Sequence, residues 1–281
     1  VLALLPDSTN IEMPGSTPSE RTVGESFNKL FQMAGDRRII IATFASNIHR
    51  IQQIIDYAVK YDKKVSVSGR SMVNVVATAI ELGYLKVPSG ILVDIDVANR
   101  LPFNEVVLIT TGSQGEPLSA LSRMAMSEHR KVKVTPNDFI IISARPIPGN
   151  EKFVNRVVNE LMRLGAEVIY EKMYEVHVSG HACQDEQKLM MALTKPQYIL
   201  PVHGEYKHLR KYSIVAKQMG IDEDHVIIPA IGQVLETDGE SFRFGGEVPS
   251  GAVMVDGLGV GDVGSIVLRD RKHLAEDGLI V

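Results

Sequence analysis

Short runs of apolar and β-branched residues alternate with amphipathic segments along most of the chain. Residues 38–45 (RIIIATFA) are of the buried-strand type, and after Asn47 the apolar residues recur every three or four positions. Strands that alternate with helices of about ten to fifteen residues are typical of βαβ units. The pattern therefore predicts an α/β fold with a doubly wound, mainly parallel sheet.

The same pattern places the individual elements. Strands are expected at residues 1–5, 38–45, 64–68, 105–110, 138–143, 166–170 and 198–202. Helices are expected after Asn47 and at residues 71–82, 117–129, 150–164, 185–193 and 206–219. Beyond residue 220 the chain changes to short strands and turns, at 227–228, 233–236, 242–244 and 252–255. This change predicts a small β-rich second layer.

Residues 177–205 hold three of the eight histidines of the chain. His177 and His181 bracket a Val-Ser-Gly run that we expect at the end of a strand, and strand 198–202 leads into His203. Ligands gather at strand ends because loops there can expose polar groups. A single histidine after a strand is more often a hydrogen-bonded turn residue. The pair of strand ends favours a functional site.

Two carboxylates are candidates to join these histidines. Asp7 follows the first strand, and Glu20 closes the sequence Thr-Pro-Ser-Glu at residues 17–20. Thr17 as N-cap with Glu20 three residues later also fits a capping box, which would make Glu20 purely structural. Carboxylate and imidazole are ligands that Zn²⁺ or Mn²⁺ accepts, although two ligands do not complete a catalytic site. A nucleophilic Cys183 or Ser179 beside His181 is a weaker alternative.

Three polar loops follow predicted strands, at residues 43–47, 111–116 and 143–146. Small residues before a helix N-terminus expose backbone N–H groups that suit phosphate oxygens. The G-x-G-x-x-G pattern at 259–264 is a different case, because the run 265–268 that follows it is of the β type. We therefore interpret it as a linker or hairpin and not as a dinucleotide site.

Composition narrows the class of protein. The 281 residues are 44% hydrophobic, which favours two domains, and a net charge of −4 gives no global basic field for nucleic acid. The single cysteine, Cys183, excludes an internal disulfide and favours the cytoplasm. No apolar run reaches the roughly eighteen residues that span a bilayer, so no membrane association is expected. The ends VLALLP and GLIV resemble cut strands and suggest a piece of a longer protein.

The motifs VLALLPDSTN, TPSER, ATFASNIHR, TTGSQGEP, PIPGN, HVSGHA, PVHGEY and DGLGVGDVGSIVLRDR follow one another in this order. Together they resemble bacterial ribonuclease J, of the β-CASP branch of the metallo-β-lactamase fold. The resemblance implies a metallo-β-lactamase αββα domain interrupted by a β-CASP domain. The expected division is 1–19 for one metallo-β-lactamase piece, 20–183 for the β-CASP domain, and 184–281 for the returning piece and linker.

The resemblance also implies an activity and a set of site residues. The family degrades RNA from a 5′-monophosphate end in the 5′ to 3′ direction, also cuts internally, and uses two divalent ions, zinc or manganese. By motif, Asp7 resembles the carboxylate that bridges the metals and His203 a ligand of the second metal. Glu20 resembles the acidic partner of His181, which lies at the scissile phosphate. The expected phosphate and nucleotide contacts are His177, Ser179, Gly180, Ser46, Asn47 and Ser143.

The chain departs from the family pattern in one respect. The H-x-H-x-D-H motif and a further histidine lie upstream of the Asp7 strand in the family, so we expect this chain to be inactive alone. The implied whole protein is a bacterial cytoplasmic ribonuclease of RNA maturation, rRNA processing and decay, forming a homo-oligomer (dimer or tetramer). Two alternatives remain at this point: a non-catalytic RNA-binding β-CASP relative and an unrelated nucleotide-phosphate-binding α/β module.

Overall fold

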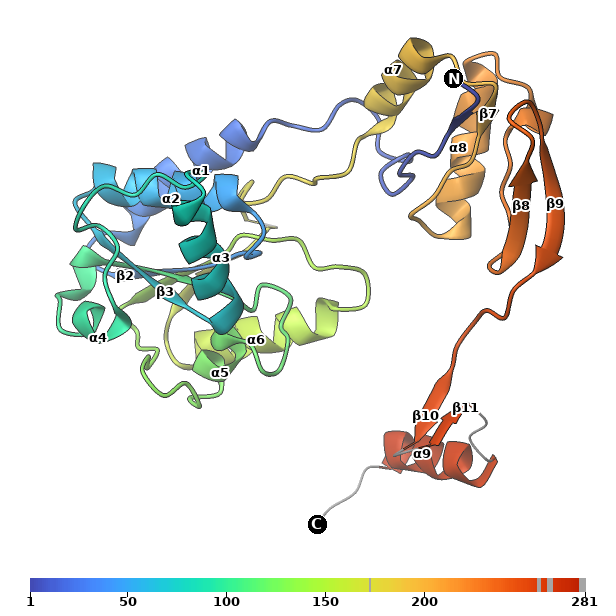
Figure 1. Cartoon of the computed structure of the whole chain (residues 1–281). Coiled ribbons are helices and arrows are strands. Elements are labelled where there is room, and N and C mark those ends of the chain that lie inside the picture. The colour runs from blue at the N-terminus through green and yellow to red at the C-terminus, as the bar shows by residue number, and fades with distance from the viewer. Residues whose placement is uncertain (172, 257–258, 262–264, 278–281) are drawn as a thin grey trace. The chain divides into compact units, whose positions relative to one another are not determined.

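The computed structural model describes residues 1–171, 173–256, 259–261 and 265–277. The chain divides into two compact units (Figure 1). The central unit comprises residues 17–180, and the terminal unit comprises residues 1–16 together with 181–281. The predicted domain borders at 19/20 and 183/184 lie within three residues of the borders of these units.

The central unit is built on one five-stranded sheet. Its strands are β2 (Arg38–Ala42), β3 (Lys64–Ser68), β4 (Val106–Thr110), β5 (Asp138–Ile142) and β6 (Glu167–Ile169). They lie in the order β3-β4-β2-β5-β6, and every neighbouring pair is parallel. The predicted parallel sheet is therefore confirmed.

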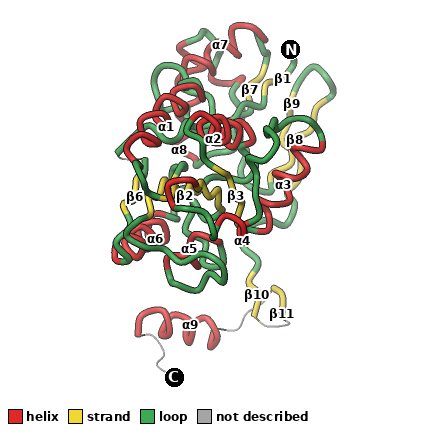
Figure 2. Tube along the Cα trace, turned by 90° about the vertical axis from the view of Figure 1, so that its left-hand side faces the viewer, coloured by secondary structure: helices red, strands yellow, loops and turns green. Residues whose placement is uncertain are grey.

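Helices cover both faces of this sheet (Figures 1 and 2). On one face lie α1 (Glu20–Ala34), α2 (Ile48–Lys60) and α3 (Arg70–Glu81), and on the other lie α5 (Ala120–Ala125) and α6 (Glu151–Arg163). Two short helices, α4 (Ile95–Ala98) and η1 (Phe103–Glu105), precede β4. Alternate residues of β2 enter opposite cores, since Ile39 and Ile41 pack with α1 and α2 while Ile40 packs with α5 and α6. A continuous apolar run forms a central strand because both of its faces are buried.

The direction of winding reverses at the centre of the sheet. From β2 the chain passes through α2 to β3, and from β5 it passes through α6 to β6, on the other side. Ligands of open α/β sheets bind at the carboxyl ends of the strands where the order reverses. The loops that follow β2 and β5 therefore occupy the place where this fold favours a site.

The terminal unit joins the two ends of the chain. Strand β1 (Ala3–Leu4) pairs in parallel with β7 (Tyr198–Ile199), and a further bridge links Asp7 with Val202. Helices α7 (Gln184–Thr194) and α8 (Tyr206–Gln218) pack on this pair through a small core. That core consists of Ile11, Met191, Ile199, Tyr212, Val215 and Ala216.

The remaining elements follow α8. After η2 (Glu223–His225), strands β8 (Gln233–Thr237) and β9 (Phe242–Glu247) form an antiparallel hairpin, and β10 (Met254–Asp256) pairs antiparallel with β11 (Gly259–Gly261). Helix α9 (Ser265–Asp277) comes last. No helix within the described ranges has the length and apolar character needed to cross a bilayer.

Several sequence predictions were wrong in detail. Residues 177–180, expected at the end of a strand, lie in a loop, because the chain leaves the sheet after β6 and the carbonyl of Val176 accepts a hydrogen bond from the Ser143 side chain. Residues 265–268, predicted as extended, begin α9, so the reason for rejecting the glycine pattern does not hold. Residues 262–264 of the pattern lie outside the described residues, and the described part, β11, pairs antiparallel with β10 and not in the parallel manner of a βαβ unit.

Two helix boundaries also differ from those expected. Helix α1 is capped by Ser19, whose side chain accepts a hydrogen bond from the backbone N–H of Arg21, and not by Thr17. Glu20 is therefore the first helical residue, which rules out the capping box. Helix α5 is shorter than the predicted 117–129, because Ser119 caps it and Ser127 takes a left-handed conformation with φ of 60°.

Candidate functional site

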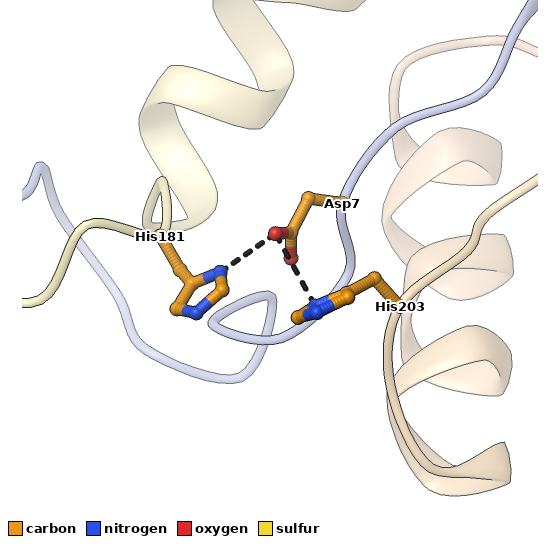
Figure 3. Close-up of side chains that lie close together, drawn as sticks. All are labelled: Asp7, His181 and His203. Carbon is orange, nitrogen blue, oxygen red and sulfur yellow. Dashed lines mark hydrogen bonds and ion pairs between the residues drawn. The ribbon is translucent and has the colours of Figure 1, made fainter. Parts of the chain in front are cut away.

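Three side chains of the terminal unit converge although they are far apart in the sequence (Figure 3). They are Asp7 after β1, His181 before α7, and His203 after β7. Each offers one ligand atom, and these atoms lie within 4.8 Å of one another. The parallel pairing of β1 with β7 explains why Asp7 and His203 meet, since the bridge from Asp7 to Val202 brings both strand ends to the same edge.

The Asp7 carboxylate is held in its charged form. Its Oδ1 accepts the backbone N–H of Thr9 at 2.8 Å, and its Oδ2 lies 2.6 Å from Nδ1 of His181. Partial burial raises the pKa of this carboxyl group, but the bonds from Thr9 and the nearby His181 lower it more, so the pKa of Asp7 lies below its ordinary value. Asp7 is thus an anion at neutral pH.

The His203 ring has a defined tautomer. The Thr9 hydroxyl donates to the carbonyl of His203 at 2.7 Å, so it must accept from Nδ1 of the same residue, which lies 2.9 Å away. The proton on Nδ1 leaves the lone pair on Nε2, the arrangement that metal-bound histidines commonly adopt. His203 also has a φ of 57°, and a non-glycine residue in this left-handed region is strained in a way that is frequent at functional sites.

His181 lies on the other side of the carboxylate. Its Nδ1 faces Asp7, and the amide of Asn10 donates to its carbonyl at 2.8 Å. The rings of His181 and His203 are stacked with centroids 5.2 Å apart. Both imidazoles therefore flank one carboxylate, which also lies 3.5 Å from Nδ1 of His203.

A chain of buried hydrogen bonds links Asp7 to helices α7 and α8. The amide of Gln187 on α7 donates to the backbone carbonyl of Asp7 at 2.7 Å and accepts from the Tyr212 hydroxyl of α8 at 3.1 Å. Burial raises the pKa of Tyr212, which keeps the phenol as a donor. The sequence does not single out Gln187 or Tyr212, because the burial of a polar residue on a helix cannot be predicted until its hydrogen-bond partner is known.

The donor set fits a divalent metal ion of the zinc or manganese type. One carboxylate and two imidazoles are the ligands that such ions prefer. The anionic state of Asp7 and the Nε2 lone pair of His203 both suit coordination, because ligands must be deprotonated. Asp7 and His203 are therefore well suited to the metal-ligand roles predicted for them, and His181 lies close enough to serve either as a ligand or beside one.

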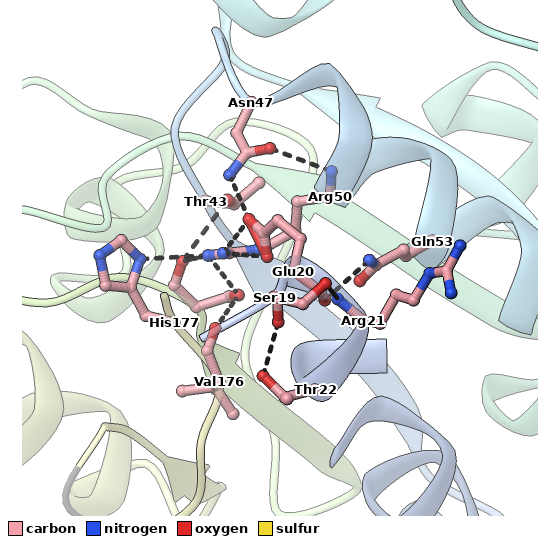
Figure 4. A network of polar contacts seen from close by, with 11 residues as sticks. Ser19, Glu20, Arg21, Thr22, Thr43, Asn47, Arg50, Gln53, Val176 and His177 are labelled. Atoms are coloured by element: carbon pink, nitrogen blue, oxygen red, sulfur yellow. Dashed lines mark hydrogen bonds and ion pairs between the residues drawn. The ribbon is translucent and has the colours of Figure 1, made fainter. Parts of the chain in front are cut away.

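Glu20 belongs to a second network, in the central unit (Figure 4). Both of its carboxylate oxygens accept from the guanidinium of Arg50, with Oε2 at 2.8 Å, and Oε1 also accepts from the amide of Asn47 at 3.0 Å. Glu20 and His181 lie in different units, so the pairing predicted for them stays a prediction. The sequence pattern gave no reason to single out Arg50.

The expected substrate contacts differ in accessibility. Ser46 and Gly180 are exposed, and Asn47, His177 and Ser179 are half-buried. Ser143 is completely buried, and its hydroxyl donates to the carbonyl of Val176 at 2.6 Å. The Ser143 side chain thereby ties β5 to the segment that carries His177, and its expected contact with the substrate stays a prediction.

Two family models match the chain in succession. Residues 36–161 match the ribonuclease J β-CASP domain, and residues 165–229 match the Zn-dependent metallo-hydrolase RNA specificity domain. These matches, together with the doubly wound parallel sheet, place the chain in the β-CASP branch of the metallo-β-lactamase fold.

Comparison with individual proteins gives the family. The chain is 46% identical over 281 residues to ribonuclease J of Thermus thermophilus, 44% identical over 280 residues to ribonuclease J of Synechocystis, and 43% identical over 282 residues to ribonuclease J2 of Bacillus subtilis. Each alignment covers 100% of this chain and 49%, 43% and 50% of the respective relative. The chain belongs to the ribonuclease J family and spans about half the length of the curated relatives it matches.

Proposed function

We propose that this chain is part of a metal-dependent ribonuclease that hydrolyses the phosphodiester bonds of RNA in RNA maturation and decay. The observation that carries the proposal is the convergence of Asp7, His181 and His203 within 4.8 Å. Family membership supports RNA as the substrate, since one matching model is an RNA specificity domain. A non-catalytic relative would have no need to keep these three side chains together.

In this proposal Asp7 and His203 bind the metal ions, and His181 transfers a proton. The ions, when bound, would polarise the phosphate and make a water molecule acidic enough to attack near neutral pH. Asp7 and His203 would hold the ions, Asp7 with its charged carboxylate and His203 with Nε2. His181 would deliver a proton to the departing oxygen from its other nitrogen, and its hydrogen bond to Asp7 through Nδ1 supports this role.

The finer features of this proposal come from the family resemblance. They are two ions of zinc or manganese, a preference for a 5′-monophosphate, 5′ to 3′ exonuclease action with internal cleavage, a homo-oligomer, and a bacterial cytoplasmic location. The single cysteine is consistent with a reducing compartment. We also propose that the chain is inactive alone, because two catalytic ions need more protein ligands than this group of three supplies.

Replacement of His181 tests the division of roles. In the full-length protein, His181→Ala should lower the rate of RNA cleavage by roughly 10² to 10⁴, the usual worth of general acid catalysis, while the bound metal stays near the wild-type amount. Cleavage rate and metal content are measured on the same samples. His225→Ala is the control, since this exposed histidine of the same unit contacts Tyr198 and not Asp7. Loss of one metal equivalent with unchanged turnover per bound metal would make His181 a ligand instead.

A further inference from the structure

Arg50 is the largest fully buried side chain of the described residues, and its charge faces the inside of the protein. It extends from α2 to the carboxyl end of β5, where its Nη1 donates to the carbonyl of Ser143 at 2.9 Å. Its Nη2 contacts both carboxylate oxygens of Glu20. A buried guanidinium is costly unless it is paired and hydrogen-bonded. Here Nη1 and Nη2 of Arg50 have partners, whereas its buried Nε has none among the described residues.

The same guanidinium fixes the protonation of His177. Nη1 of Arg50 lies 3.2 Å from Nδ1 of His177, and because arginine can only donate, Nδ1 must be the acceptor. The proton of the neutral ring is therefore on Nε2. Figure 4 shows this second ring nitrogen pointing away from Arg50. His177 thus offers an N–H donor on the side of the ring that faces out of the network.

Charge and burial both keep His177 neutral. Burial lowers its pKa most, the positive charge of Arg50 adds to this, and the pKa falls to about 4. Glu20 and Glu171 act in the opposite direction, and Arg145 lowers the pKa further. Arg145 and Glu171 form an ion pair with each other at 2.8 Å and act on the pKa of His177 in opposite directions.

The place of this network in the fold points to function. It connects the first turn of α1, the end of β5 and the segment before Gly180, at the reversal point of the sheet where α/β folds bind ligands. The sequence motifs contain Glu20 and His177 but indicate no residue that relates the two. Arg50 contacts both.

We propose that Arg50, with its charge balanced by the Glu20 carboxylate, is a positioning residue that fixes the Nε2–H tautomer of His177, so that this N–H donor is pre-arranged for the RNA phosphate. This inference rests on the proposed ribonuclease function. Lysine cannot replace arginine in the role, because only the planar guanidinium supplies donors to three partners at fixed angles.

Nitrogen-15 NMR of the histidine rings in the 281-residue chain tests the first part without any variant. His177 should be neutral at pH 7, with its proton on Nε2, and should become charged only near pH 4. His129 is the internal reference, because its Nδ1 accepts backbone N–H groups of Lys131 and Val132 and so gives the same tautomer through backbone donors. Burial and the nearby Arg123 lower the pKa of His129 independently of Arg50. A proton on Nδ1 of His177, or a charged ring at pH 7, overturns the proposal.

Variants of Arg50 test whether this residue sets the tautomer and the pKa of His177. In Arg50→Met the pKa of His177 should rise by roughly one to three pH units, because a positive neighbour is lost and Glu20 remains, while His129 should not change. If Arg50→Met does not fold, Arg50→Lys replaces it in this test, because lysine retains the positive charge. In Arg50→Lys the ring of His177 should populate both neutral tautomers instead of one. An unchanged tautomer and pKa of His177 in the folded variants would show that Arg50 does not set them.

Kinetics of the full-length protein tests the link to RNA. Arg50→Lys should lower kcat/KM by about 10- to 100-fold, the effect of a misplaced reacting group, with unchanged metal content. Unchanged kcat and KM would overturn the positioning role. If instead the wild-type protein cleaves no RNA while His177 behaves as described, the proposed function fails and the structural role of Arg50 stands.

Discussion

At the scale of single residues, the site depends on the backbone as much as on its side chains. The sequence allowed Asp7 and His203 to be placed at neighbouring strand ends, because each follows a short apolar run. It gave no sign of Gln187, Tyr212 or Arg50. Their roles come from partners more than twenty residues away, and only the fold reveals such partners.

Gly204 shows how closely the backbone packs beside His203. A Cβ atom there would lie 2.6 Å from Oγ of Ser8 and 3.0 Å from Cβ of His208. The Ser8 hydroxyl cannot move away freely, because it donates to the carbonyl of Val202 at 2.9 Å. Only glycine fits without a shift of the turn that carries His203.

Gly204→Ala should therefore weaken metal binding by the full-length protein about 10- to 100-fold, as is typical when the support of a ligand is disturbed. Titration with Zn²⁺ or Mn²⁺ measures this. Gly246→Ala is the matched control, because a Cβ at that position meets nothing within 4 Å. Equal metal affinities of the two variants would show that the close contact at Gly204 does not position His203.

At the scale of elements, the sequence was most informative where periodicity is strong. Strands β2 to β5 and helices α2 and α6 lie close to their predicted bounds, because continuous β-branched runs and regular apolar stripes leave few alternatives. Residues 177–180 and 265–268 lie in a loop and in helix α9 and not in the expected strands. In both, a few apolar residues favoured a strand, and no partner strand was available to pair with them among the described residues.

The ion pair between Glu20 of α1 and Arg50 of α2 leads to a prediction about the free energy of unfolding. Glu20 is the carboxylate that compensates Arg50, whose side chain is fully buried while that of Glu20 is 31% exposed. Glu20→Gln leaves the positive charge without a counter-ion, so it should lower the free energy of unfolding of the central unit by about 3 kcal/mol. Denaturant unfolding of the 281-residue chain measures the change.

Glu160→Gln is the control for this variant. Glu160 pairs with Arg163, whose side chain is 75% exposed, so loss of that pair should cost at most about 0.5 kcal/mol. If both variants unfold at the same denaturant concentration, Glu20 does not stabilise the buried arginine. Its carboxylate would then be available for the role beside His181 that the family resemblance implies.

At the scale of the whole molecule, the candidate metal site is a product of chain topology. Residues 1–16 and 181–281 belong to one unit although residues 17–180 separate them in the sequence, and this is what brings Asp7 to His181 and His203. The sequence suggested such an interruption only through its resemblance to a known family, because local patterns carry no information on which distant segments share a sheet.

The central claim is that Asp7 links metal binding to RNA cleavage. The most direct measurement is the metal content and the cleavage rate of full-length Asp7→Asn in the same samples. Asparagine retains the oxygen that accepts from Thr9 but removes the charge that favours cations. Asp238→Asn is the control, since that hydrogen-bonded carboxylate of the same unit lies in the turn between β8 and β9.

We expect Asp7→Asn to lose bound metal and roughly a hundredfold or more of its activity on 5′-monophosphorylated RNA, with Asp238→Asn unchanged. An Asp7→Asn protein that keeps its full metal content and wild-type cleavage rate would contradict the account.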